Sequence, residues 1–174
     1  MILWKSSLYE LSPSIVTRNS ITIVLNIIGS NDNICVTNIY APHKAAGTIQ
    51  LLQTVMKIIE TIPLPYKIIV RDFNMVLNLD EKKGGIRKLD KDSEVFQATI
   101  DKLSLIDIPM INGTFTWNNI RGGVRQIASR LDHFLLSEAI YMNSWETEAR
   151  ILPQMGSDHW PISLKVHISY GPKN

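Results

Sequence analysis

The 174-residue chain has one cysteine and no long apolar run, and each shortage excludes a class of protein. Because Cys35 stands alone, there is neither a disulfide framework nor a cysteine zinc site, and a reducing compartment is expected. The apolar start is too short for a signal peptide, and no run reaches the roughly 20 residues of a membrane span. We therefore expect an intracellular protein that does not bind membranes.

The chain also lacks a large excess of charge of one sign, since 18 Lys and Arg against 16 Asp and Glu leave a net charge of +2. This balance is too weak to argue for nucleic-acid binding by itself. Five basic residues form a cluster that acidic residues interrupt: Lys82, Lys83, Arg87, Lys88 and Lys91. We expect a solvated loop here in the first place and a phosphate-binding segment in the second. The length and the 45% hydrophobic content fit one globular domain with its own core.

Strands dominate the first half of the chain. The β-branched runs 21–28 and 34–40 flank a turn cluster and predict a hairpin, and 1–4 also looks like the middle of a strand. Residues 44–61 have apolar positions at helical spacing. The short apolar run 67–70 predicts a buried strand, which delivers polar residues at its C-terminal end.

The second half is mixed. Residues 80–92 predict a loop, and Ser93 is a candidate cap for a following helix. Further strands are predicted at 113–117, 130–136 and 161–168, with a turn at 121–123. Many strands with two or three helices, and no linker or repeat, indicate an α+β layered domain with sheets at its centre.

Polar side chains with hydrolytic chemistry follow the predicted strands. Asp72 with Asn74, then Asp132, and then Asp158 with His159 lie at strand ends or turns. Adjacent side chains on a strand point to opposite faces, so the last pair belongs at the mouth of a strand. A metal-assisted phosphodiesterase needs carboxylates for Mg²⁺, an acid–base histidine and an amide donor. Tyr40, at another strand end, offers a hydroxyl to a phosphate.

Each of these residues also has a structural interpretation. A single Asp at a strand end is more often a turn or cap residue, and a lone histidine is more often structural than catalytic. Trp117 and Trp160 are more often core residues than stacking platforms. Three other histidines have no partner motif and are expected to be structural or exposed: His43, His133 and His167.

Taken together, four segments resemble the endonuclease/exonuclease/phosphatase family, in the family's order: 38–42, 72–74, 129–137 and 157–161. The chain is more similar still to the endonuclease domain of plant LINE-type (non-LTR) retrotransposons, through 81–85, 113–118 and Trp160. The resemblance covers nearly the whole chain. It implies the DNase I-like fold, a four-layer α/β sandwich of two packed, mostly antiparallel sheets flanked by helices.

The resemblance also implies a role for each candidate residue. His159 would be the acid–base residue at the scissile phosphate, and Asp132 would orient it. Asp72, with Asn74 beside it, would position or activate the attacking water. Asp158 would bind the metal ion. Tyr40 and Trp117, together with Asn74, would contact the substrate. The reaction would be hydrolytic nicking of DNA, with Mg²⁺ or Mn²⁺ stabilising developing charge.

Two departures from the family pattern complicate this function. The family begins with strands that carry an Asn and the main Glu metal ligand, whereas residues 1–5 resemble sequence that the family places after them. We therefore expect a single partial domain over 1–174, truncated at its N-terminus and monomeric or prone to aggregate. Arg71 replaces a glycine before Asp72, and either pairs with that carboxylate or points away from it.

Several functions therefore stay open. The first is an endonuclease of retroelement origin, compatible with a nuclear location and with a reverse transcriptase domain downstream in intact relatives. The second is a non-catalytic remnant of the same fold that binds nucleic acid weakly at most. The third is a phosphatase or deadenylase, because a fold alone does not settle the substrate.

Overall fold

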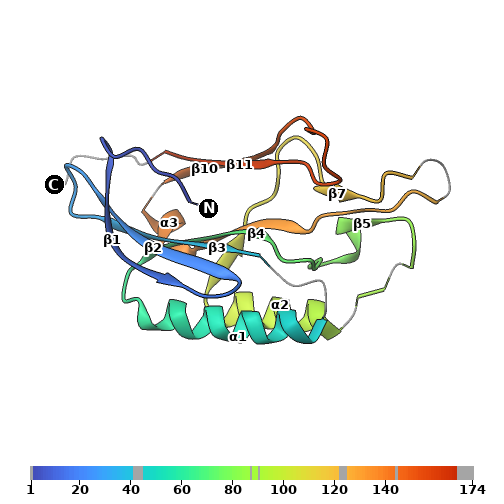
Figure 1. Ribbon diagram of the computed structural model, residues 1–174, viewed down its shortest axis with the longest axis horizontal. Coiled ribbons are helices and arrows are strands. Elements are labelled where there is room, and N and C mark those ends of the chain that lie inside the picture. The colour runs from blue at the N-terminus through green and yellow to red at the C-terminus, as the bar shows by residue number, and fades with distance from the viewer. Residues whose placement is uncertain are drawn as a thin grey trace.

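The computed structural model describes residues 2–40, 45–86, 88–89, 91–121, 125–143 and 145–167, without the side chains at 45, 46 and 71. Three sheets and three α-helices make up this part of the chain (Figure 1). The main sheet has the order β1 (Tyr9–Val16), β2 (Ser20–Ile27), β3 (Asn33–Ile39), β4 (Tyr66–Asp72), β9 (Asp132–Ser137) and β6 (Leu105–Asp107). Only the β3–β4 pair is parallel.

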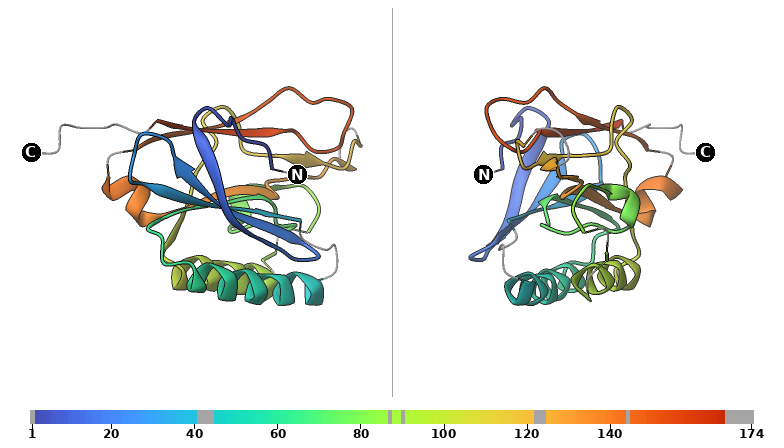
Figure 2. Two further views of the ribbon diagram at one scale, coloured as in Figure 1. Left: turned by 60° about the vertical axis from the view of Figure 1, so that its left-hand side comes forward. Right: turned by 90° about the vertical axis from the view of Figure 1, so that its right-hand side faces the viewer.

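Two helices cover one face of the main sheet. The helix α1 (Ala45–Thr61) makes the crossover that the parallel β3–β4 pair requires, and α2 (Lys91–Lys102) lies beside it (Figure 2). Their apolar positions pack on the sheet in one buried cluster, which includes Cys35, Leu52, Ile69, Phe73 and Phe96. The two helices thus cover one face of the main sheet, and the ends of β4 and β9 remain accessible from the opposite face.

The second layer lies on the opposite face of the main sheet. It consists of the antiparallel pair β10 (Glu146–Ile151) and β11 (Ile162–His167), with the short helix α3 (Glu138–Met142) nearby (Figure 1). A second buried cluster, including Phe134, Leu136, Ile140, Trp145 and Ala149, fills the space between the sheets. Within the described residues, no helix covers the outer face of β10 and β11.

A small third sheet joins the two layers near the candidate site. Its strands are β5 (Lys82–Lys83), β8 (Ala128–Ser129) and β7 (Trp117–Asn118), paired in that order. A 3₁₀ turn at Leu79–Glu81 precedes β5. An isolated antiparallel bridge between Trp117 and His159 connects this sheet to the segment between β10 and β11.

The predicted hairpin, the helix over 44–61, and the strands near 67–70, 130–136 and 161–168 are confirmed within one to two residues where the chain is described. Residues 122 and 123 of the predicted turn, and 168 of the last strand, lie outside the described part. The strands β1, β6 and β10 and the helix α3 were not predicted, because their patterns are short or mostly exposed.

Four local predictions are wrong. The predicted loop over 80–92 contains the end of the 3₁₀ turn, the strand β5 and the first two residues of α2. Residues 2–5 form no strand, because the described chain offers them no partner, and Leu3 is 82% exposed. Ser93 is not a cap but a buried residue inside α2, whose first turn carries Asp92 and Glu94 at the favourable end of the helix dipole. The strand predicted over 113–117 shrinks to its last residue, since pairing with β8 begins only at Trp117.

Candidate active site

Two carboxylates and a histidine form the centre of the candidate site. Asp72 ends β4 and Asp132 begins β9, and the antiparallel register places them directly opposite each other. Each is only 7% exposed. The Nδ1 atom of His159 lies 3.0 Å from Oδ2 of Asp132, while its Nε2 lies 4.0 Å from Oδ2 of Asp72. The imidazole therefore lies between two carboxylates that would otherwise repel each other across the ladder.

The loop after β4 holds Asp72 in place. The Asn74 backbone N–H donates to Oδ1 of Asp72 over 2.8 Å, and the Asn74 amide donates to Oδ2 over 3.3 Å. Asn74 has φ +54°, a left-handed conformation that asparagine tolerates better than most residues. Phe73 is buried, and its N–H donates to the Leu131 carbonyl beside Asp132. The loop thus joins both acidic strand ends.

Thr116 is a structural residue of the site that sequence reasoning missed. Its hydroxyl accepts hydrogen bonds from the backbone N–H groups of Leu131 and Asp132 at 3.0 and 3.1 Å. Its carbonyl accepts from the N–H of Trp160, next to His159. Thr116 is fully buried. It lies in the 113–118 motif, but nothing in a lone threonine indicates that it joins two distant segments.

A second pair orders the exposed side of the site. The indole N–H of Trp117 donates to Oδ2 of Asp158 over 2.8 Å, and the N–H of Asn118 donates to the Asp158 carbonyl. The indole hydrogen bond, with smaller contributions from the nearby charge of His159 and from Ser157, lowers the pKa of Asp158 below its usual value. Asp158 therefore presents a carboxylate at neutral pH.

All seven predicted site residues line one open cavity of about 930 Å³: Tyr40, Asp72, Asn74, Trp117, Asp132, Asp158 and His159. Asn38 also lines it and received no role from the sequence, although it opens the 38–42 motif. Trp117 and Trp160 are half-buried in the cavity wall rather than members of the core. None of the described members of the basic cluster at 82–91 lines this cavity.

The donor set suits Mg²⁺ chemically. Asp72, Asn74 and Asp158 offer carboxylate and amide oxygens, and Mg²⁺ is usually held by one or two carboxylates together with water and substrate phosphate. Each carboxylate has about four lone-pair sites, so a carboxylate that accepts hydrogen bonds can also bind a cation.

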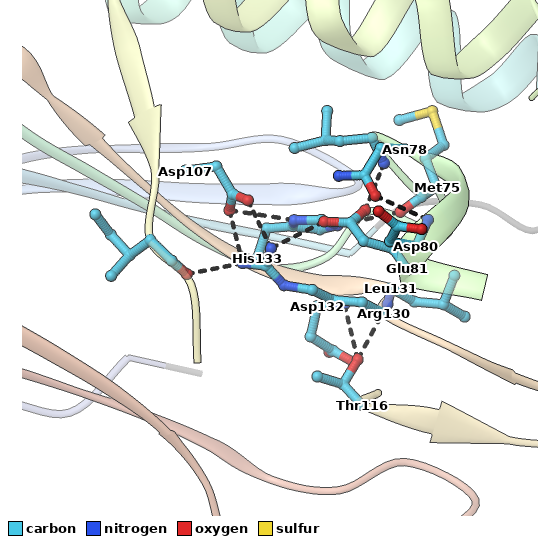
Figure 3. A network of polar contacts seen from close by, with 12 residues as sticks. Met75, Asn78, Asp80, Glu81, Asp107, Thr116, Arg130, Leu131, Asp132 and His133 are labelled. Atoms are coloured by element: carbon cyan, nitrogen blue, oxygen red, sulfur yellow. Dashed lines mark hydrogen bonds and ion pairs between the residues drawn. The ribbon is translucent and has the colours of Figure 1, made fainter. Parts of the chain in front are cut away.

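A separate cluster of the buried Glu81 and His133 with the half-buried Asp107 also has ligand atoms within 4.8 Å of one another. The guanidinium of Arg130 already occupies this space (Figure 3). It donates to Glu81 over 2.9 Å and to both oxygens of Asp107 over 2.7 and 2.9 Å. A permanent cation at this position satisfies the carboxylates, so the cluster is an internal ion network rather than a metal site.

His133 lies on the other face of β9 from Asp132. Its Nδ1 is 3.2 Å from Oδ1 of Asp107, and its Nε2 is 3.2 Å from the carbonyl of Met75, just after the Asp72–Asn74 loop. The ring is fully buried, with edge contacts to Phe73 and Phe96. The expectation that His133 is structural or exposed thus resolves to a structural residue beneath the site.

Two features of the sequence lie outside the description. The side chain of Arg71 is not described, so its relation to Asp72 stays a prediction, and His43 falls in the undescribed segment 41–44. His167 is exposed on β11, away from the cavity lining. Among the described helices, none is long and apolar enough to cross a membrane.

No family model matches the chain, and no curated protein matches its sequence. Its structure is similar to the endonuclease domain of TRAS1, a telomere-specific non-LTR retrotransposon, with a TM-score of 0.68 and 18% identity over 94% of this chain and 71% of that one. An endonuclease/exonuclease/phosphatase family protein from Bacteroides thetaiotaomicron gives 0.59 and 12%, covering 97% and 69%. A mannosyl-6-phosphatase from the same organism gives 0.57 and 13%, covering 94% and 68%.

These similarities establish the fold. The chain has the DNase I-like fold of endonuclease/exonuclease/phosphatase proteins. This confirms both the α+β class predicted from the strands and helices and the fold that the four motifs implied. Proteins with this fold include an endonuclease domain and a phosphatase, so the fold by itself leaves the substrate open.

Proposed function

We propose that the chain is a Mg²⁺-dependent phosphodiester hydrolase, a DNA-nicking endonuclease of retrotransposon origin. The observation that carries this proposal is His159, which touches Asp132 through Nδ1 and directs Nε2 toward Asp72 in an open cavity. A histidine oriented by one carboxylate and facing another is suited to moving a proton during phosphate ester cleavage. The similarity to the TRAS1 endonuclease domain supports a DNA substrate.

The proton-transfer chemistry follows from the contacts of His159. Asp132 accepts the Nδ1–H, which fixes the tautomer and leaves Nε2 to exchange a proton with the scissile phosphate or its leaving group. The 4.0 Å gap between Nε2 and Asp72 exceeds a direct hydrogen bond, and it lets one water contact both groups. Asp72, held by Asn74, positions that water for attack.

The remaining cavity residues bind and orient the substrate. Tyr40 is half-exposed at the end of β3 and offers its hydroxyl to a phosphate oxygen. The indole N–H of Trp117 donates a hydrogen bond to Asp158, and the face of its ring would contact a sugar or base of the substrate. Asp158, with Asp72 and Asn74, would hold Mg²⁺. When bound, the ion would stabilise the negative charge that develops on the phosphate.

The competing function is a non-catalytic remnant with at most weak nucleic-acid affinity. One observation favours it. Within the described residues, no three His, Cys, Asp or Glu residues of the cavity each bring one ligand atom within 4.8 Å of the others, and the cluster that meets this distance is the one filled by Arg130. A phosphatase is the third candidate, supported by the similarity to the mannosyl-6-phosphatase.

Supercoiled plasmid separates these functions. The protein is incubated with plasmid and Mg²⁺ beside His159→Ala, with His167→Ala as a matched control on the exposed surface of β11. We expect nicking by the wild type and by His167→Ala, and a loss of at least about 100-fold in His159→Ala. Absence of nicking with all proteins would support the remnant. Hydrolysis of a phosphate monoester without nicking would support the phosphatase.

A further inference from the structure

A shallow recess of about 190 Å³ adjoins the active-site cavity. Its lining is the turn between β1 and β2 with the adjoining strand residues, 16–21 in all, together with Asn38 and Tyr40. Asn38 and Tyr40 also line the main cavity, so the two hollows adjoin each other at these residues. The three carboxylates and the histidine of the proposed site line only the main cavity: Asp72, Asp132, Asp158 and His159.

The turn that forms the recess is held firmly against the site. The side-chain amide of Asn19 donates to the Tyr40 carbonyl over 3.0 Å, and the Tyr40 N–H donates to the Asn19 carbonyl over 2.8 Å. Within the turn, the Thr17 hydroxyl accepts from the Ser20 N–H and shares a 2.7 Å hydrogen bond with the Ser20 hydroxyl. The backbone of the turn is thus ordered before any ligand arrives, which lowers the entropic cost of binding.

Arg18 lies at the tip of this turn. The described residues that line the two hollows include more acidic than basic side chains. Among the described residues that line the main cavity, three are carboxylates: Asp72, Asp132 and Asp158. Arg18 is the only Lys or Arg among the described residues that line either hollow. Its side chain is exposed, and no ion pair with another described residue occupies it. A guanidinium beside an acidic site is suited to a phosphate that does not react.

We propose that Arg18 binds a backbone phosphate that flanks the scissile one, so that the site takes a DNA chain rather than a small phosphate ester. The assignment of the scissile phosphate to the His159 cavity rests on the proposed function. DNA carries a phosphate about every 3.4 Å of axis along each strand, so a strand that leaves the cavity past Tyr40 presents further phosphates to the recess. A small monoester in the main cavity would occupy a hollow that Arg18 does not line.

The test measures binding and its salt dependence. A fluorescent 20-base-pair DNA duplex is titrated with protein in EDTA, so that binding is read without cleavage, at several salt concentrations. We expect Arg18→Ala to weaken binding about three- to tenfold and to reduce the slope of log K against log salt by about one. Arg18→Lys should restore most of both, because the contact is largely electrostatic. Lys57→Ala, at an exposed residue of α1 that lines neither hollow, is the control and should change neither.

A second measurement separates this proposal from the proposed function. Hydrolysis of bis(4-nitrophenyl) phosphate, which fits the main cavity alone, should be equal in the wild type and Arg18→Ala. DNA binding that depends on Arg18 in a protein without nicking activity would uphold the phosphate site and reject the nuclease. Nicking with DNA affinity and salt slope unchanged in Arg18→Ala would reject the phosphate site and keep the nuclease. Absence of duplex binding by the wild type would also overturn the proposal.

Discussion

His159 and Asp132, 27 residues apart in the chain, are joined by a 3.0 Å contact between Nδ1 and Oδ2. The carboxylate is buried at the start of β9, whereas the ring is about one-third exposed at the cavity. A buried carboxylate that receives one ring nitrogen leaves the other nitrogen to work at the open side. This geometry makes Asp132 a positioning residue whose effect is carried through His159.

Replacement of Asp132 should therefore affect turnover more than substrate binding. An asparagine at this position would retain the shape, but its amide does not enforce the Nδ1–H tautomer. We expect Asp132→Asn to lower kcat for plasmid nicking about 10²- to 10⁴-fold, with KM changed by less than about threefold. Steady-state kinetics provide the measurement, and Asp101→Asn on the exposed face of α2 is the control. A rise in KM with kcat intact would assign Asp132 to substrate binding instead.

The hydrogen bond from Trp117 predicts a measurable change at Asp158. Because this bond lowers the pKa of Asp158, its stabilising effect is present above the group's ordinary value of 3.8 and is lost as pH falls through the lowered pKa. Trp117→Phe removes the indole donor, so the pKa of Asp158 should rise toward its ordinary value. Carboxyl ¹³C NMR during an acid titration measures it. Trp160→Phe keeps the bond and should leave the Asp158 titration in place.

The buried ion network should be far more important to stability than a surface pair. Arg130→Met leaves the buried Glu81 and the half-buried Asp107 without their cation, and we expect the free energy of unfolding to fall by about 3–5 kcal/mol. Urea denaturation followed by far-UV circular dichroism measures this. The control is Arg150→Met, which breaks the exposed pair with Glu148 and should leave the midpoint unchanged. Equal midpoints for both variants would show that Glu81 and Asp107 find other partners.

Gly84 should tolerate a side chain worse than Gly29, although both have similar positive φ values of +74° and +84°. A Cβ at Gly84 would lie 2.1 Å from the carbonyl oxygen of Gln126, while one at Gly29 would meet nothing within 4 Å. Gly29→Ala should cost only the left-handed strain of about 1–2 kcal/mol, and Gly84→Ala should cost more. Thermal unfolding of both variants compares them. Equal losses would mean that the β5–β8 pair shifts freely to accommodate the methyl group.

Much of the fold was predictable because the signals are local. The β-branched runs of β2 and β3 and the helical spacing of α1 need only neighbouring residues to be recognised. The predicted site residues also line one cavity. Asp72, Asp132 and His159 each lie at the end of a strand or beside one. Strand ends are where irregular backbone can aim side chains into a cavity.

Other features could not be predicted because they depend on distant partners. Serine is a residue type favoured at helix N-caps, yet α2 begins two residues before Ser93 and buries it. Thr116 is a common residue type whose role arises only when β9 and the 157–160 segment pack beside it. Arg130 and His133 carry charge or polarity in a run that otherwise has the pattern of a strand, so their shared buried network is visible only in the fold.

The sequence by itself determined which residue types stand at which strand ends, because side-chain chemistry and local periodicity are properties of neighbouring residues. The tertiary structure decided that Asp72 faces Asp132 across a ladder, that His159 lies between them, and that the turn bearing Arg18 adjoins Tyr40. Those relations depend on strand register and on packing between sheets. They arise only when segments that are far apart in the chain bury their apolar faces against each other.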